Sequence, residues 1–94
     1  MTVNGEPAEQ LSVDVTQHME RDLEGNRVPG NMDIEVQARF SLTQVDVVYQ
    51  CYKHAVQIVL DDGSTGSGYI RRWLVDRRGV LVWLVGSGPF VQPS

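Results

Sequence analysis

Met32-Asp33-Ile34-Glu35-Val36-Gln37-Ala38-Arg39-Phe40-Ser41-Leu42 is the most regular run of the chain and the main evidence for its fold. An apolar residue stands at every second position, and the residues between them are polar until Ser41. Successive side chains of a strand point to opposite faces of a sheet, so this period of two predicts a half-buried strand over Met32–Leu42. The fold therefore contains a sheet with one face in a core and one face in water.

The sequence before this strand predicts a second strand and a turn. Leu11, Val13 and Val15 alternate with polar residues, which is the pattern of a half-buried strand. A short helix begun near Asp14 or Thr16 is the alternative, because residues 15, 19 and 23 are all apolar and four apart. Gly25-Asn26 and Pro29-Gly30-Asn31 then predict a turn or loop. Met1–Gln10 is almost without apolar residues, which predicts a flexible tail.

The segment after Met32–Leu42 predicts a helix over Thr43–Ala55 and then a strand over Val56–Leu60. An apolar stripe at helical spacing supports the helix, and Thr43 is placed to cap it. The members of the stripe are Val45, Val48, Tyr49, Tyr52, Ala55 and Val59. The alternative is a strand throughout, because the same run is rich in β-branched and aromatic residues.

The last third of the chain predicts a hairpin. Asp61-Asp62-Gly63 is a turn signal, and the glycine-rich Ser64–Gly68 extends the loop. Strands follow at Tyr69–Val75 and Val80–Val85, joined by a turn over residues 76–79 with glycine at its last position. If this turn pairs residues 75 and 80, then Trp73 faces Val82 and Arg72 faces Trp83 across the hairpin. Strict alternation places Tyr69, Arg71, Trp73, Val75, Val80, Val82 and Leu84 on one face and Ile70, Arg72, Leu74, Leu81, Trp83 and Val85 on the other.

These elements predict a mainly β (α+β) fold of about five antiparallel strands, arranged as a small barrel or curled sheet with one helix. Residues 1–10 are expected to be a flexible tail, and residues 11–94 a single β-rich domain, as the short chain allows. The run Thr43–Val85 resembles the Sm-like and SH3-like small β-barrels, in which a helix leads to a strand ending in Asp-Asp-Gly and then to a glycine-bearing strand. The resemblance implies a binding module for RNA or protein that is often oligomeric and has no catalytic activity.

Charge is distributed unevenly along the chain. The net charge is −4, but residues 1–62 contribute −7 and residues 63–94 contribute +3. An acidic chain repels bulk nucleic acid, whereas a local cluster of arginines can still bind a phosphate or a carboxylate. A single cysteine excludes an intramolecular disulfide and indicates a reducing compartment, so we expect a cytoplasmic protein. The longest apolar runs are too short to cross a bilayer, so we expect no membrane contact.

Two patterns invite a catalytic or ligand-binding interpretation. Gly63–Gly68 is rich in glycine, but it lacks the spacing and the Lys-Ser or Lys-Thr of a phosphate-binding loop. Cys51 and His54 are three residues apart, as a nucleophilic pair on one helical turn would be, or as part of a metal site with His18. The sequence supplies neither a third orienting group nor a fourth ligand at a recognisable spacing. We therefore predict no cofactor and no metal, and a structural role for Cys51.

The most informative group of side chains is on the predicted hairpin. Arginine and tryptophan together are typical of binding hot spots, because they supply contact area and fixed donors at low entropic cost. The candidate binding residues are Arg71, Arg72, Trp73, Arg77, Arg78 and Trp83. They predict a non-enzymatic binding or regulatory module that contacts a protein partner, or a second copy of itself, through the hairpin 69–85. The alternatives are a small enzyme with a cavity between helix and sheet that uses Cys51 and His54, and an RNA-binding small barrel.

Overall fold

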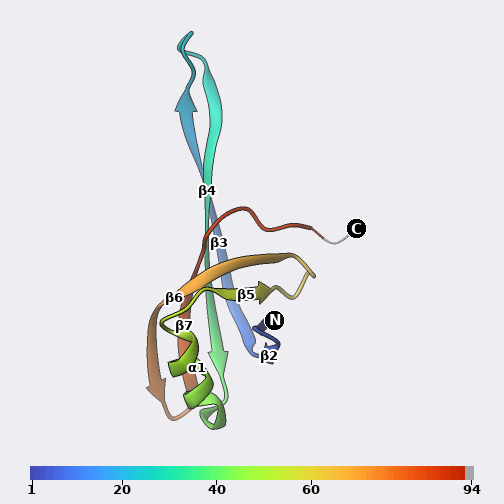
Figure 1. The fold of residues 1–94 in the computed structure, drawn as a ribbon, viewed down its shortest axis with the longest axis vertical. Coiled ribbons are helices and arrows are strands. Elements are labelled where there is room, and N and C mark those ends of the chain that lie inside the picture. Colours follow the sequence, from blue (N-terminus) through green and yellow to red (C-terminus); the bar gives the residue numbers. More distant parts are fainter. Residues whose placement is uncertain (93–94) are drawn as a thin grey trace.

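The computed structural model describes residues 1–92, apart from the side chains of residues 17, 31 and 32. Within these residues the chain forms one antiparallel sheet of seven strands in the order β2-β1-β5-β6-β7-β4-β3, with one short helix (Figure 1). The strands are β1 (Thr2–Val3), β2 (Glu6–Pro7), β3 (Glu9–Arg21), β4 (Arg27–Phe40), β5 (Val56–Val59), β6 (Thr65–Asp76) and β7 (Gly79–Gly86). A 3-10 turn, η1 (Leu42–Gln44), leads into the helix α1 (Val45–Cys51). The predicted mainly β fold with one helix is confirmed.

The sheet is strongly curled, and its inner face makes the core. The two strands at the ends of the sheet order, β2 and β3, are separated in the chain only by Ala8, whose N–H donates to the carbonyl of Met1 at 2.9 Å. Side chains from five strands and from α1 pack inside this curl. The buried apolar residues are Val3, Ile34, Val36, Ala38, Phe40, Val48, Val56, Ile58, Leu60, Ile70, Val80, Val82 and Leu84.

The predicted alternating strand is present as β4, and its alternation is confirmed by the burial of every second side chain from Ile34 to Phe40. The side chain of Met32 lies outside the described residues, and Leu42 has left the strand for η1 and is 47% exposed. The strand begins earlier than predicted, at Arg27, so Pro29 and Gly30 lie within it rather than in a loop. In this part β4 is paired with β3 alone. An open edge is where a sheet tolerates a proline.

The predicted helix is confirmed but is shorter, and its cap differs. Ser41 caps the turn, because its hydroxyl accepts from the N–H of Thr43 at 3.3 Å and its own N–H donates to the Gln44 side chain at 3.0 Å. Thr43 is therefore inside the turn and is not the cap. The helix ends at Cys51, which leaves Ala55 outside it and exposed. No helix within residues 1–92 has the length and apolar character needed to cross a membrane.

The first ten residues differ from the predicted flexible tail. β1 pairs with β5, and Val3, opposite Ile58, is 1% exposed. The terminal ammonium of Met1 lies 2.6 Å from the carboxylate of Asp61. Strands of two residues are too short to give a periodic pattern, and their burial comes from the distant strand that they complete.

The hairpin β6–β7 has the predicted register, with one irregularity. Val75 lies opposite Val80, Trp73 opposite Val82 and Arg72 opposite Trp83, as predicted. A bulge at Arg71 breaks the alternation. As a result Ile70 lies in the core opposite Leu84, and Tyr69 is on the outer face. The predicted faces are therefore wrong for these two residues. β6 also begins at Thr65, so the loop before it is shorter than the predicted Ser64–Gly68.

The outer half of the β3–β4 hairpin stands away from the rest of the molecule (Figure 1). β7 pairs with β4 only over Glu35–Phe40, so residues 14–33, which we call the arm, are a ribbon of two strands. The arm ends in a turn in which the Gly25 N–H donates to the carbonyl of Asp22 at 3.1 Å, which confirms the turn predicted at Gly25-Asn26. Because of the arm, the molecule measures 54 × 28 × 21 Å.

Candidate protein-binding surface

The outer face of the β6–β7 hairpin is built around a stacked pair. The guanidinium carbon of Arg72 lies 4.4 Å from the centre of the Trp83 ring. The tight turn between Asp76 and Gly79 sets this register, because it fixes which residue of β6 meets which residue of β7. Trp83 is half-buried between Arg72 and Gln37, its neighbour on β4. The stack fixes the plane of the guanidinium, so its donors point in defined directions.

Apolar side chains continue from this stack along the same outer face. Tyr69 is 47% exposed and Leu74 is 49% exposed, and Leu81 and Val85 are half-buried beside them. The outer face of an antiparallel sheet is normally polar where it meets water. An apolar strip bordered by arginines is instead typical of the central part of a protein interface.

Arg71 differs from Arg72 because it occupies the bulge and is engaged within the chain. Its guanidinium lies 3.5 Å from the carboxylate of Glu35 on β4. Both residues line a hollow of about 510 Å³ at the foot of the arm, together with Asp14 and Asp33. The imidazole of His18 lies 2.5 Å from the Asp33 carboxylate in the same hollow. This part of the outer face is acidic in spite of its arginine.

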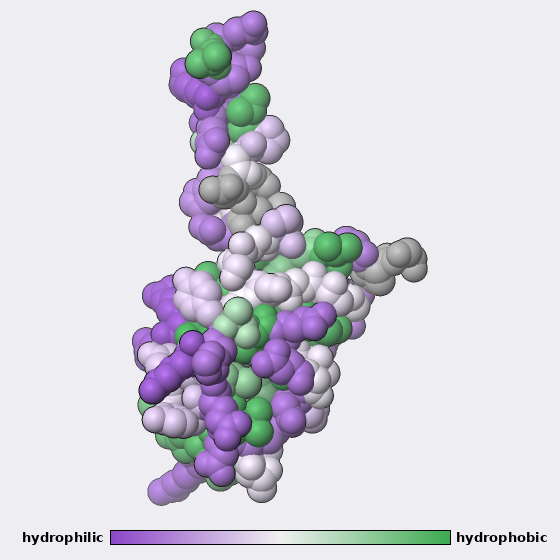
Figure 2. Space-filling model, viewed as in Figure 1, coloured by the Kyte–Doolittle hydropathy of each residue, from purple (hydrophilic) through white to green (hydrophobic). Residues whose placement is uncertain are grey.

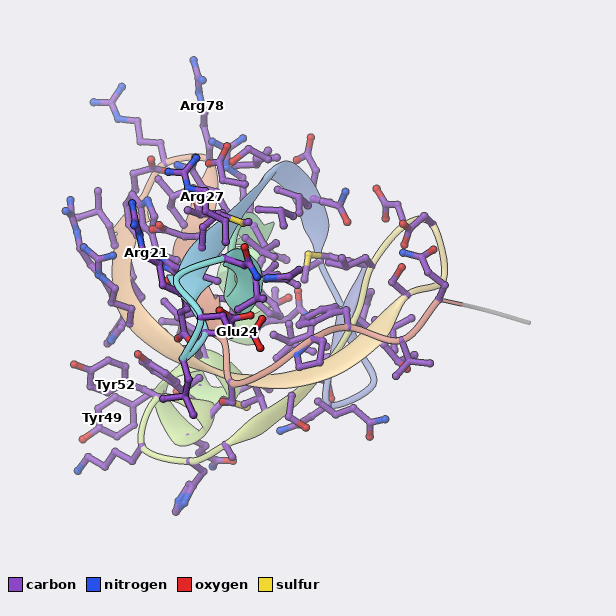
Figure 3. All side chains as sticks on the ribbon, turned by 90° about the horizontal axis from the view of Figure 1, so that it is seen from above. Arg21, Glu24, Arg27, Tyr49, Tyr52 and Arg78 are labelled. Atoms are coloured by element: carbon purple, nitrogen blue, oxygen red, sulfur yellow. The ribbon has the colours of Figure 1, made fainter. Side chains whose placement is uncertain are left out.

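Trp73 lies on the opposite side of β6 from Arg72 and contacts the helix. Its ring meets Tyr49 of α1 and Tyr52, which caps the end of α1, edge-on at centroid distances of 6.4 and 6.5 Å. Trp73 is half-buried, whereas the two tyrosines are 56% and 40% exposed. They lie side by side and point away from the body (Figure 3). The ammonium of Lys53 lies 5.9 Å from the centre of the Tyr49 ring.

Arg77 and Arg78 form the exposed tip of the hairpin. The Arg78 N–H donates to the carboxylate of Asp76 at 2.7 Å, which holds the turn, while its side chain projects into solvent (Figure 3). Within the described part of the chain, no ion pair engages the side chains of Arg72, Arg77 or Arg78. These three guanidinium groups are therefore available to an acidic partner.

The structure thus separates the six residues that the sequence proposed as one site. Arg72 and Trp83 come together on the outer face, Arg71 is turned to Glu35, and Trp73 belongs to the side that carries α1. Sequence reasoning missed the exposure of Tyr49 and Tyr52, because it assigned both to the buried stripe of the helix. Their hydroxyl groups were the available signal, since tyrosine prefers positions with one end in water.

The residues considered for catalysis do not form a site. Cys51 is half-buried, and its sulfur accepts a long hydrogen bond from the Asn4 amide at 3.7 Å. His54 lies beyond the end of α1 and is exposed, with its backbone N–H bonded to the Cys51 carbonyl. No group of three or more His, Cys, Asp or Glu side chains among the described residues is placed to hold a metal ion.

Comparisons with protein family models, with curated proteins and with solved structures give no match. The resemblance to small β-barrels accordingly stays an expectation. Function is inferred below from the side chains of the hairpin and of the surfaces beside it.

Proposed function

We propose that this chain is a non-enzymatic binding module that contacts a protein partner through the outer face and the turn of the β6–β7 hairpin. The observation that carries the proposal is the stack of Arg72 on Trp83, with exposed apolar residues beside it. A half-buried tryptophan and an oriented arginine are the side chains that most often dominate binding energy at protein interfaces.

The chemistry of the hairpin indicates the kind of partner. Three guanidinium groups without ion pairs in the described chain favour carboxylates, and the apolar strip from Tyr69 to Leu74 favours an aliphatic or aromatic side chain. We therefore expect a protein surface that presents Asp or Glu next to an apolar residue. Nucleic acid fits less well, because Asp14, Asp33 and Glu35 line the hollow beside the hairpin and would repel phosphates.

A peptide panel tests this proposal. Acidic peptides that contain a Leu or Phe are compared with counterparts in which Lys replaces every acid. The Trp73→Phe variant is used so that tryptophan emission reports Trp83 alone. We expect the acidic apolar peptides to shift the Trp83 emission and to bind more weakly as salt is raised.

Matched variants locate the contact. Combining Arg72→Ala, Arg77→Ala and Arg78→Ala should abolish the emission shift, because it removes the three available guanidinium groups. Arg21→Ala with Arg27→Ala, on the arm, removes positive charge elsewhere and should leave binding unchanged. Equal binding of the Lys peptides, tighter binding of single-stranded RNA, or binding that survives the triple variant would contradict the proposal.

A further inference from the structure

The arm presents three apolar side chains that are half exposed or more. Val15 is 56% exposed and Met19 is 50% exposed, and Leu23 at the turn is fully exposed. Val15 lies opposite the buried Ile34 and so on the inner face of the sheet, and Met19 follows four residues later on the same strand. An isolated hairpin of two strands is only marginally stable in water. A partner that covers this face would stabilise the arm.

The edges of the arm are poorly suited to pairing with another strand. The pairing of β3 with β4 is irregular between Gln17 and Met19, and Pro29 interrupts the β4 side. Bulges and prolines are the means by which proteins prevent edge-to-edge association of strands. The arm is therefore built to be contacted on a face rather than along an edge.

The arm is also acidic. It carries five carboxylates and two arginines, a net charge of −3. The acids are Asp14, Glu20, Asp22, Glu24 and Asp33, and the bases are Arg21 and Arg27. Hydrophilic residues surround a few strongly apolar ones towards its end (Figure 2). A fitting partner surface is apolar and basic.

Such a surface exists at the other end of the same molecule. We call it the base, and it consists of Tyr49, Tyr52, Lys53, Val75, Arg77 and Arg78. The two tyrosines are exposed and Val75 is 45% exposed. Lys53 follows α1, with its ammonium 5.9 Å from the centre of the Tyr49 ring. Arg77 and Arg78 lie on the β6–β7 turn, and Figure 3 shows Arg78 across this end of the molecule from the tyrosines. Figure 1 shows α1 and this turn at one end of the long axis and the end of the arm at the other. The arm therefore cannot reach the base of its own chain.

We propose that a second copy of this chain covers the arm, with the arm of each protomer lying on the base of the other in a two-fold dimer. Apolar side chains of the arm would meet the tyrosines and Val75, and its carboxylates would meet Lys53, Arg77 and Arg78. Reciprocal contact uses both arms and both bases and leaves none open, and two-fold dimers are the commonest closed assembly. This inference rests on the proposed function, because it names the partner of the hairpin turn.

Charge reversal on each surface tests the dimer. The arm variant combines Glu20→Lys with Glu24→Lys, which spares Asp22 because its carboxylate accepts from two backbone N–H groups of the turn. The base variant combines Arg77→Glu with Arg78→Glu. In sedimentation equilibrium at about 100 µM, the wild-type chain should have roughly twice the 10.5 kDa of one chain. Each variant alone should dimerise at least about tenfold more weakly, because like charges would meet.

An equimolar mixture of the two variants is the decisive measurement. In the mixed pair, each arm meets a base of opposite charge, so a heterodimer should form at concentrations at which each variant alone is mainly monomeric. Glu6→Lys, on β2 and outside both surfaces, is the matched control and should leave the wild-type mass unchanged. Circular dichroism confirms that each variant is folded.

The other outcomes overturn the inference and are distinguishable from a failure of the proposed function. A monomeric wild-type chain, a dimer that both variants leave intact, or a mixture that stays monomeric would exclude the arm-to-base contact. If the chain is monomeric and still binds acidic apolar peptides through Arg72, Arg77 and Arg78, the proposed function stands and its partner is another protein.

Discussion

Gly79 shows how one residue fixes the binding hairpin. Its φ of +138° is a backbone conformation that side chains rarely adopt, and a Cβ there would lie 2.2 Å from the carbonyl oxygen of Phe40. This carbonyl belongs to the backbone of β4, so it cannot rotate away as the end of a side chain could. The turn therefore depends on glycine, and with it the register that places Arg72 over Trp83.

Gly79→Ala is accordingly expected to destabilise the fold by at least about 1–3 kcal/mol, from backbone strain and the clash together. Chemical denaturation measures the change. Gly25→Ala is the control, because Gly25 also has a positive φ, of +84°, but no atom lies within 4 Å of its added Cβ. The control should cost only about 1 kcal/mol, from the left-handed conformation itself. Equal losses at the two positions would contradict this account of the turn.

Arg72 acts on the surface rather than in the core. Arg72→Ala should change the free energy of unfolding by only about 0.5–1 kcal/mol, the range of an exposed cation–π contact. In the Trp73→Phe background, the emission of Trp83 should shift to longer wavelength, because the ring loses its cover. Arg77→Ala, at the turn, should leave the emission unchanged. An emission spectrum that does not respond to Arg72→Ala would show that the stack does not form in solution.

At the scale of elements, the strands β1 and β2 belong to the fold. Val3 is 1% exposed and the Met1 ammonium pairs with Asp61. Deleting residues 1–7 should therefore lower stability by about 1.5–3 kcal/mol from the burial of Val3 alone, with the lost strand pairing in addition. Thermal denaturation of the deleted and full-length chains checks this. An unchanged melting temperature would restore the interpretation of these residues as a flexible tail.

The charged carboxylate of Asp62 stabilises the turn between β5 and β6. The backbone N–H of Ser64 donates to the Asp62 carboxylate at 2.8 Å, which lowers the pKa of Asp62 from its ordinary 3.8. A lowered pKa in the folded state stabilises the fold above pH 3.8, and this contribution is lost as the pH falls further through the folded pKa. The Ser64 amide resonance should follow this titration, and Asp62→Asn should abolish it. A midpoint at or above 3.8 would contradict the assignment.

The elements also show how far the sequence predicts this structure. β4 and the β6–β7 register were predictable, because alternation over Ile34–Phe40 and a tight turn at Asp76–Gly79 are local properties. The bulge at Arg71 was not predictable, because it depends on the curvature of the whole sheet and not on the residues next to it in the sequence. The arm was missed because Pro29-Gly30 has the composition of a loop, although an open edge accommodates it within a strand. In the candidate site, sequence predicted the Arg72–Trp83 pair but not the exposure of Tyr49 and Tyr52.

At the scale of the whole molecule, the fold is elongated, and its two ends carry charges of opposite sign. The radius of gyration is 15.1 Å, whereas a compact chain of this length has about 12 Å. The excess comes from the arm, which carries acidic and apolar residues away from the basic and apolar base. An elongated chain buries less apolar surface than a compact chain of the same length. Contact between two copies would bury part of the surface that is left exposed.

Hydrogen exchange at two protein concentrations tests the joint role of arm and base most directly. Within the described residues no third strand pairs with the arm, so its amides should exchange quickly in dilute protein, where the chain is monomeric. At about 100 µM, well into the expected dimer, we predict slower exchange over residues 14–33 together with residues 45–54 and 72–80. The base variant Arg77→Glu with Arg78→Glu should lose this protection in both regions at once. Exchange in the arm that is the same at both concentrations, or protection of the arm that survives in the base variant, would contradict the account.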